Sequence, residues 1–297
     1  MREGFKEAIL NLGEDKKFVV LTGDHGYALF DEFKSAFPNQ FFNVGIAEAN
    51  LVGVAAGLAR TGYQPLIYGL ASFLPNRVYE FLKLQVALDS LPVTVVGDGG
   101  GLVYSTLGHS HQSLDDLAIA NSLPNFSIFS PSSDGETAAI LQDPSRLTGP
   151  RYLRLGKSDG GYKGSFTNRV GEAYLVSAGS DKGKAIVCHG AMTSRVLELK
   201  DSGQIPDFDV WSYPTLKSPS RNWMEGALAY RKVIIVEEHI EHGGLFSILL
   251  PSFACTSVHL VPVCASKEFH HGVGNYEWAL ESRGLGNSDL VAKINQQ

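Results

Sequence analysis

The sequence predicts an α/β protein made of two domains, each built on a parallel type of sheet. Short apolar runs alternate with amphipathic windows, which is the rhythm of a parallel sheet covered by helices on both faces. A stretch rich in glycine and lysine at 156–164 interrupts this rhythm and is typical of a linker. The 297 residues are enough for two separate cores. We therefore expect one domain at 1–160 and a smaller one at 161–297.

Apolar runs and helical windows place the expected elements. In the first domain we expect strands at Phe18–Thr22, Phe41–Val44, Pro65–Gly69, Pro92–Val96 and Phe126–Ser130, and helices at Asn76–Leu88 and Gly135–Gln142. In the second domain we expect strands at Ala185–Cys188, Asp209–Trp211 and Val233–Val236, and helices around Ser194–Leu199 and Trp223–Tyr230.

Composition excludes several classes of protein. A formal charge of −6 argues against nucleic acid as a main partner. No apolar run approaches the roughly 18 residues of a membrane span, and the charged start of the chain is not a signal peptide. The 3 cysteines have no metal-ligand spacing, and their odd number fits reduced thiols in the cytoplasm.

The most informative stretch is Phe41–Ala59, which reads as a short strand turning through Gly45 into a helix of small residues. Arg60 and Gly62 then supply a cation in the last turn and a C-cap glycine. Glu48 is the only charged residue between Lys34 and Arg60. On spacing alone a capping role is favoured for Glu48, and a buried acid is the alternative.

A second polar segment runs over Leu107–Ala118 (LGHSHQSLDDLA). It could be no more than a polar helix start. Histidine, however, exchanges protons at neutral pH, so His111 is also a candidate acid–base group.

The loop Gly97–Gly101 (GDGGG) follows a strand and could pass for a phosphate-binding loop. Leu102 replaces the last glycine of a dinucleotide fingerprint, so that interpretation fails. We expect a glycine turn at the carboxyl edge of the sheet.

Together these segments resemble the transketolase family over residues 1 to about 290. Asn43–Ala59 is similar to the family's NVGIAEQN…AAGLA signature, and Ser110–Ala118 to its [ST]HQ…EDLA segment. Glu237–Leu245 (EEHIEHGGL) is similar to the EEH…GGLG segment of the transketolase C-terminal domain, where it is structural. A metal site at Glu238, His239 and His242 would need a spacing such as HExxH, which is absent.

The resemblance implies a thiamine diphosphate pyrimidine-binding domain followed by a transketolase C-terminal domain. It implies that Glu48 contacts the pyrimidine nitrogen, that Phe73 stacks on the pyrimidine ring, and that His111 faces the reacting carbon. The other residues expected at the site are Asp24, Ile46 and Tyr68 for the cofactor (with Tyr79 as a substitute for the aromatic), and His109 and Arg154 for the substrate. A pairing of Arg154 at the sheet edge is an equally good alternative.

The resemblance also implies a partner. The family's diphosphate-binding domain precedes this region, so a separate N-terminal subunit is expected to hold the diphosphate and Mg²⁺, in an α2β2 heterotetramer. The expected activity is transfer of a two-carbon ketol unit between sugars or sugar phosphates. Leu107 stands where many transketolases carry an aspartate that reads sugar hydroxyls, so the preferred donor is left open.

Three alternatives remain at this point. Two are related thiamine enzymes, a 2-oxo acid dehydrogenase E1 β subunit and a 1-deoxyxylulose-phosphate synthase. The third is a non-catalytic binding or regulatory subunit, which Glu48 counts against because an unused buried acid is costly.

Overall fold

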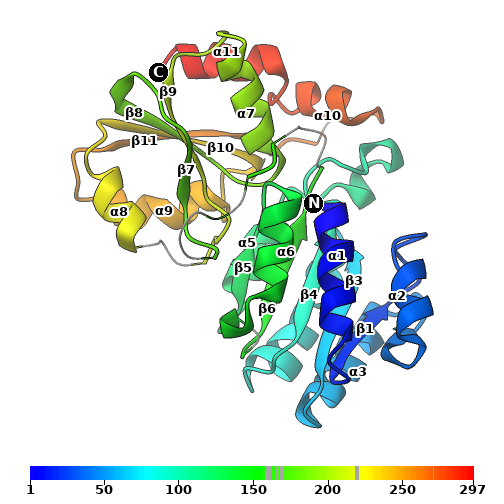
Figure 1. The fold of residues 1–297 in the computed structure, drawn as a ribbon. Coiled ribbons are helices and arrows are strands. Elements are labelled where there is room, and N and C mark those ends of the chain that lie inside the picture. Colours follow the sequence, from blue (N-terminus) through cyan, green and yellow to red (C-terminus); the bar gives the residue numbers. More distant parts are fainter. Residues whose placement is uncertain (147, 158–161, 165, 167–169, 218–220, 270) are drawn as a thin grey trace.

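The computed structural model describes residues 1–297 except 147, 158–161, 165, 167–169, 218–220 and 270. Its strands form two sheets, one in each half of the chain (Figure 1). The predicted two-sheet α/β architecture is therefore confirmed. The predicted domain boundary at residue 160 lies outside the described residues.

The first sheet has six strands in the order β2-β1-β3-β4-β6-β5, and every pairing is parallel. The strands are β1 (Phe18–Thr22), β2 (Phe41–Asn43), β3 (Gln64–Leu70), β4 (Thr94–Asp98), β5 (Ser127–Phe129) and β6 (Arg151–Leu155). The helices are α1 (Arg2–Gly13), α2 (Asp31–Ala36), α3 (Glu48–Arg60), α4 (Tyr79–Phe81), α5 (Asp116–Ser122) and α6 (Asp134–Gln142).

Helices cover both faces of this sheet, as alternation along β1 requires. Val19 and Leu21 pack with α3, whereas Phe18 and Val20 pack with α1 on the opposite face. Both faces are buried, which explains why β1 reads as one continuous apolar run.

The second sheet has five strands in the order β11-β10-β8-β9-β7, of which only β7 pairs antiparallel. The strands are β7 (Tyr174–Ser177), β8 (Asp181–Cys188), β9 (Phe208–Ser212), β10 (Lys232–Ile240) and β11 (His259–Ala265). The helices are α7 (Ala191–Asp201), α8 (Arg221–Ala227), α9 (Leu245–Phe253), α10 (Tyr276–Ser282) and α11 (Asn287–Asn295).

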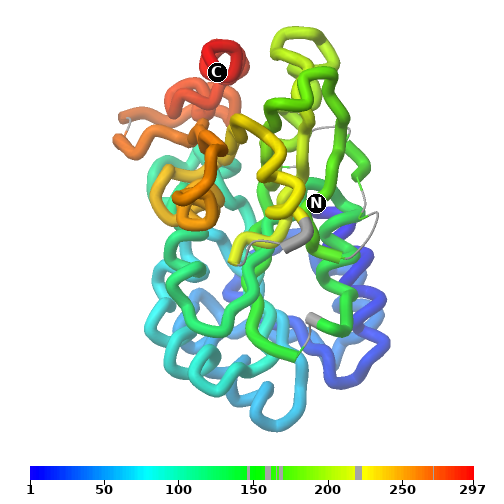
Figure 2. The backbone as a smooth tube through the Cα atoms, turned by 90° about the vertical axis from the view of Figure 1, so that its left-hand side faces the viewer, coloured from blue at the N-terminus to red at the C-terminus, as the bar shows by residue number. Residues whose placement is uncertain are grey.

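The two halves share one apolar core. Buried residues of α5, among them Leu117 and Ala120, belong to the same cluster as Tyr213, Trp223 and Leu245 of the second half. Figure 2 shows the second half stacked directly on the first. The shared core fixes the two sheets relative to each other.

Several predicted bounds were wrong. β4 begins at Thr94 instead of Pro92, because proline lacks the donor that a central strand needs. Asn76–Leu88 is a chain of short 3₁₀, α and π turns (76–78, 79–81 and 82–87) and not one regular helix. The helix expected to reach Tyr230 ends at Ala227. β6, β7 and β11 were not predicted as strands.

Within the described ranges, no helix is both long and apolar enough to cross a membrane.

Candidate functional site

The candidate site lies at the carboxyl edge of the first sheet, where parallel strands deliver their following loops together. Asp24 and Phe73 lie in the loops after β1 and β3, Glu48 begins α3 after β2, and the glycine turn starts at the end of β4. The predicted site residues come from separate stretches of sequence, and the sheet order explains why several of them meet.

Glu48 is the first residue of α3, after a turn in which Gly45 adopts a φ of +77°. This left-handed conformation favours glycine and lets the chain leave β2 and enter the helix at once. The Glu48 side chain is 11% exposed, and its carboxylate lies 3.2 Å from Nη1 of Arg77. Glu48 therefore pairs with a side chain, so the capping role favoured on spacing is not the one that the structure supports.

Phe73 brings the site residues together. Its ring lies in the turn after β3, only 8% exposed. The Arg77 guanidinium lies 3.6 Å from the Phe73 ring centroid, at the distance of a cation–π contact. Arg77 therefore contacts both Phe73 and Glu48. The sequence analysis did not predict a role for Arg77.

His111 packs against the same ring. The centroids of Phe73 and His111 lie 5.4 Å apart in an edge-to-face arrangement. Nδ1 of His111 lies 2.9 Å from the Ser110 hydroxyl, which fixes one ring nitrogen by a hydrogen bond. Nε2 of His111 takes no part in this contact with Ser110.

The remaining predicted cofactor residues divide into two groups. Asp24 is exposed at the end of β1, where Asn43 donates to its carboxylate over 3.1 Å. Ile46 is 74% exposed beside Glu48. Both therefore stay as predictions.

Tyr68 lies elsewhere. It is 1% exposed and packs on Phe5 and Phe30 in the core, and burial raises the pKa of its hydroxyl well above the usual value. A ring enclosed in this way has no face for a cofactor, so the structure argues against the expectation for Tyr68. Tyr79 is half-buried near α5, and its hydroxyl accepts a hydrogen bond from Ser122.

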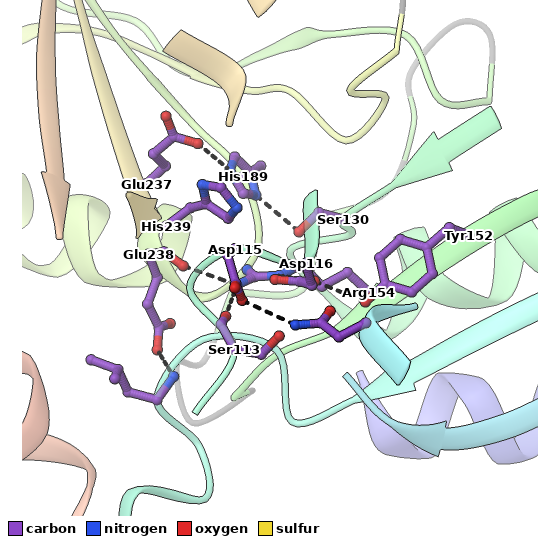
Figure 3. A network of polar contacts seen from close by, with 12 residues as sticks. Ser113, Asp115, Asp116, Ser130, Tyr152, Arg154, His189, Glu237, Glu238 and His239 are labelled. Carbon is purple, nitrogen blue, oxygen red and sulfur yellow. Dashed lines mark hydrogen bonds and ion pairs between the residues drawn. The ribbon is translucent and has the colours of Figure 1, made fainter. Parts of the chain in front are cut away.

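Arg154 is buried between the two halves of the chain (Figure 3). Its Nε lies 2.9 Å from Asp116 Oδ2, and the two side chains are 2% and 0% exposed. Its Nη2 donates to the backbone oxygens of Ser113 and Glu238, at 3.1 and 2.9 Å. The structure thus favours the pairing alternative for Arg154 over the predicted contact with an anionic substrate.

Glu238 joins the second half to the glycine turn. Its Oε1 accepts from the Leu102 amide and its Oε2 from the Tyr276 hydroxyl, each over 2.7 Å. Burial raises the pKa of Glu238. Gly101 has a φ of +82°, and a Cβ there would lie 2.3 Å from Glu238 Oε1. The glycine turn therefore allows Glu238 to pack closely against it. These contacts agree with the structural role expected for Glu237–Leu245.

Ser130, His189 and Glu237 form a second buried chain of polar contacts (Figure 3). His189 Nδ1 lies 2.9 Å from the Ser130 hydroxyl, and its Nε2 lies 3.4 Å from Glu237. A serine, a histidine and a glutamate in contact resemble a hydrolase triad, but all three side chains are at most 1% exposed. Burial lowers the pKa of His189, so its ring is neutral at pH 7. We assign these three hydrogen-bonded residues to packing between the two halves. No sequence motif connects them, because they lie 48 or more positions apart.

A pocket of about 440 Å³ lies beside the histidine loop. His109 forms one wall and Lys267, Phe269 and Arg283 of the second half form another. The sequence predicted a substrate contact for His109 but none for Lys267, Phe269 or Arg283, because no motif marks these three residues. Among the described residues, no group of three or more His, Cys, Asp or Glu side chains could hold a metal ion.

Comparisons with known proteins agree with this geometry. The family model described as "Transketolase, pyrimidine binding domain" matches residues 1–162. A solved structure, described as a split gene transketolase in an inactive beta4 tetramer, has a TM-score of 0.84 and 31% identity, covering 99% of this chain and 96% of its own. A transketolase from Campylobacter jejuni has the same fold, with a TM-score of 0.79 and 19% identity over 100% of this chain and 46% of its own.

Two relatives in sequence differ in length. A protein of Methanocaldococcus jannaschii, provisionally named as a transketolase C-terminal section, is 29% identical over 100% of this chain and 96% of its own length. The 1-deoxy-D-xylulose-5-phosphate synthase of Dictyoglomus thermophilum is 31% identical over 98% of this chain, which spans 48% of that enzyme. By its pyrimidine-binding domain and its full-length likeness to a split transketolase chain, this protein belongs to the transketolase family.

Proposed function

We propose that this chain is the pyrimidine-binding subunit of a two-chain transketolase that depends on thiamine diphosphate. It would transfer a two-carbon ketol unit from a ketose to an aldose, either of which can carry a phosphate. The observation that carries this proposal is the convergence of Glu48, Phe73 and His111 around one position at the sheet edge.

The residues present fit the aminopyrimidine part of the cofactor. Arg77 places a flat, hydrogen-bonding group on the Phe73 ring and against Glu48 at the same time. A ring face and a carboxyl group at this spacing suit a flat heterocycle with a hydrogen-bonding nitrogen. Glu48 and Phe73 would hold the pyrimidine, with Asp24 and Ile46 as further contacts. When bound, the cofactor supplies a nucleophilic carbon and accepts the electron pair of the broken C–C bond.

This chain's residues would orient the sugar and move protons. His111 would take a proton from a substrate hydroxyl and return it to the acceptor's oxygen, and such general acid–base catalysis typically contributes about 10²–10⁴-fold to the rate. His109 would contact the substrate from the adjoining pocket wall.

The proposal includes a partner. We place the pyrimidine-binding domain at 1–160 and the C-terminal domain at 161–297, with the diphosphate and Mg²⁺ held by a separate subunit in an α2β2 assembly. The related split-gene chain is described as inactive in its beta4 form, which supports a partner requirement. The three cysteines, none in a disulfide, suit a cytoplasmic setting.

The deoxyxylulose-phosphate synthase reaction is the second candidate, supported by the 31% identity to such an enzyme. The two reactions are separated by their donors, since the synthase would use pyruvate with glyceraldehyde phosphate and a transketolase would use a ketose.

The test is titration calorimetry of thiamine diphosphate with Mg²⁺ into this chain alone and into its complex with the partner. The partner is the protein that copurifies from the native source and carries a diphosphate motif. We expect weak binding by the chain alone and tight binding by the complex, because charge-assisted contacts to the diphosphate are the strong ones. Tight Mg²⁺-dependent binding by this chain alone would contradict the proposal that a separate subunit holds the diphosphate and Mg²⁺.

A further inference from the structure

Arg77 lies directly over the aromatic ring of the candidate site. Its backbone amide donates to the backbone oxygen of Phe73 over 3.0 Å, which closes one helical turn between the two residues. Side chains four positions apart on such a turn contact each other, and the later side chain covers the earlier one. The Arg77 guanidinium accordingly lies against the Phe73 ring, 3.6 Å from the ring centroid.

The same guanidinium also reaches Glu48 at the start of α3. Nη1 of Arg77 lies 3.2 Å from Oε1 of Glu48. A flat group with hydrogen-bonding nitrogens thus rests on a ring face and against a carboxylate. Phe73 and Glu48 are the two residues that would hold the aminopyrimidine, which is also flat and also carries hydrogen-bonding nitrogens. Arg77 and the aminopyrimidine would therefore use the same two binding partners.

Little of the Phe73 ring is left uncovered. The residue is 8% exposed, and the rings of His25 and His111 have their centroids 5.9 and 5.4 Å from its own. Both histidines are half-buried, whereas the Arg77 side chain is 50% exposed. Of these three neighbours, Arg77 is the one that can leave the ring and enter solvent without opening the core.

The contacts of Arg77 are of a kind that a well-anchored ligand can displace. Exposed ion pairs and exposed cation–π contacts each contribute little free energy. Charge-assisted contacts to a diphosphate are stronger. A cofactor that is also held by its diphosphate can therefore displace Arg77, whereas a heterocycle without that anchor meets a competitor already in place.

We propose that Arg77 occupies the aminopyrimidine position in the cofactor-free chain and must leave it before thiamine diphosphate binds. The inference rests on the proposed function and adds a residue that lowers the cofactor affinity of the chain. Only molecules in which Arg77 has left the ring can bind the cofactor, so the apparent affinity is reduced by their fraction. Until then Arg77 keeps Glu48 paired and Phe73 covered.

The test is titration calorimetry of thiamine diphosphate with Mg²⁺ into the cofactor-free two-chain complex. Arg77→Ala frees the ring face and Glu48. We expect it to bind the cofactor about three- to thirtyfold more tightly than the wild type, the combined scale of one exposed ion pair and one cation–π contact. Arg77→Lys keeps the charge but loses the flat group, so it should gain less than Arg77→Ala.

Arg60→Ala is the matched control. Arg60 lies at the other end of α3 and pairs with Asp89 over 2.7 Å, and its side chain is 45% exposed. The control therefore removes the same charge from an ion pair of similar exposure. Its cofactor affinity should equal that of the wild type.

A second measurement uses this chain alone and needs neither the partner nor a sugar. The aminopyrimidine half of thiamine, as its neutral hydroxymethyl derivative, is titrated into the 15N-labelled wild type and Arg77→Ala. We expect binding to be at least about threefold tighter in Arg77→Ala, on the same scale as above. In the wild type, the Nε–H signal of Arg77 should shift as the heterocycle displaces it. These results would support the inference even if the reconstituted enzyme transfers no ketol unit and the proposed function fails.

Two results would overturn the inference. One is a cofactor affinity of Arg77→Ala that equals or falls below that of the wild type, because Arg77 would then not compete with the cofactor. The other is an equal gain in Arg60→Ala, which would assign the effect to net charge. Either result can occur in a complex that still transfers ketol units, so it separates this inference from the proposed function.

Discussion

Replacing Arg154 with methionine should destabilise the fold strongly. The guanidinium forms two contacts with Asp116, at 2.9 and 3.2 Å, in surroundings where neither side chain is more than 2% exposed. In Arg154→Met, Asp116 would lose both contacts with the guanidinium and keep the hydrogen bond from the Tyr152 hydroxyl, which is 2.8 Å long. Breaking a buried pair from one side typically costs about 3–5 kcal/mol, since it leaves an uncompensated charge.

The assay is urea unfolding followed by circular dichroism, which yields the free energy of unfolding of each variant. Arg77→Met is the matched control, because it removes an arginine from an ion pair in which the arginine is 50% exposed. Such exposed pairs contribute about 0–1 kcal/mol, so this control should stay close to the wild type. The double variant Arg154→Met/Asp116→Asn should recover much of the lost stability, because no unpaired charge remains. If Arg154→Met unfolds like the wild type and instead raises KM for phosphorylated sugars, the structural assignment of Arg154 is wrong.

Three further predictions concern Glu48, His111 and His189. Glu48→Gln should keep the circular dichroism spectrum and lose nearly all turnover in the reconstituted enzyme; activity within about tenfold of the wild type would remove its catalytic role. His111→Ala should lower kcat by about 10²–10⁴-fold, whereas His242→Ala should leave it nearly unchanged; the reverse order would move the site to the second domain. Because burial depresses the folded-state pKa of His189 below its unfolded value near 6.5, the unfolded chain binds the extra proton, and stability should fall as the pH drops below about 6.5. Urea unfolding from pH 7 to 5 should show a shallower loss in His189→Gln, by up to about 2 kcal/mol at pH 5; identical slopes would contradict the assignment.

Local patterns predicted the elements whose signal lies within a few residues. β1 agrees at both ends with its prediction because its buried faces make it continuously apolar. The turn from β2 into α3 was also predictable, because Gly45 and Gly62 mark the start and end of the helical segment with positive φ values.

Contacts between distant segments were not predictable in this way. Tyr68 and Phe73 are both aromatic residues near the end of β3, and only the packing shows that the first lies in the core and the second at the site. Arg77 and Arg283 belong to no motif, and their roles arise from Glu48 and Gln112, which lie 29 and 171 positions away in the sequence. The resemblance to a family supplied roles for Glu48 and His111 that spacing alone did not.

The shared core between the two sheets restricts where a gene of this kind can be divided. A break between residues 155 and 174 would expose the apolar residues of α5. It would also remove the Glu238 backbone oxygen, which accepts a hydrogen bond from Arg154. The loop carrying His109 and His111 would also lose its second-half wall. Fission at that boundary would produce two aggregation-prone fragments. We therefore expect these two halves to be inherited together, and gene fusions or fissions to be tolerated only outside them.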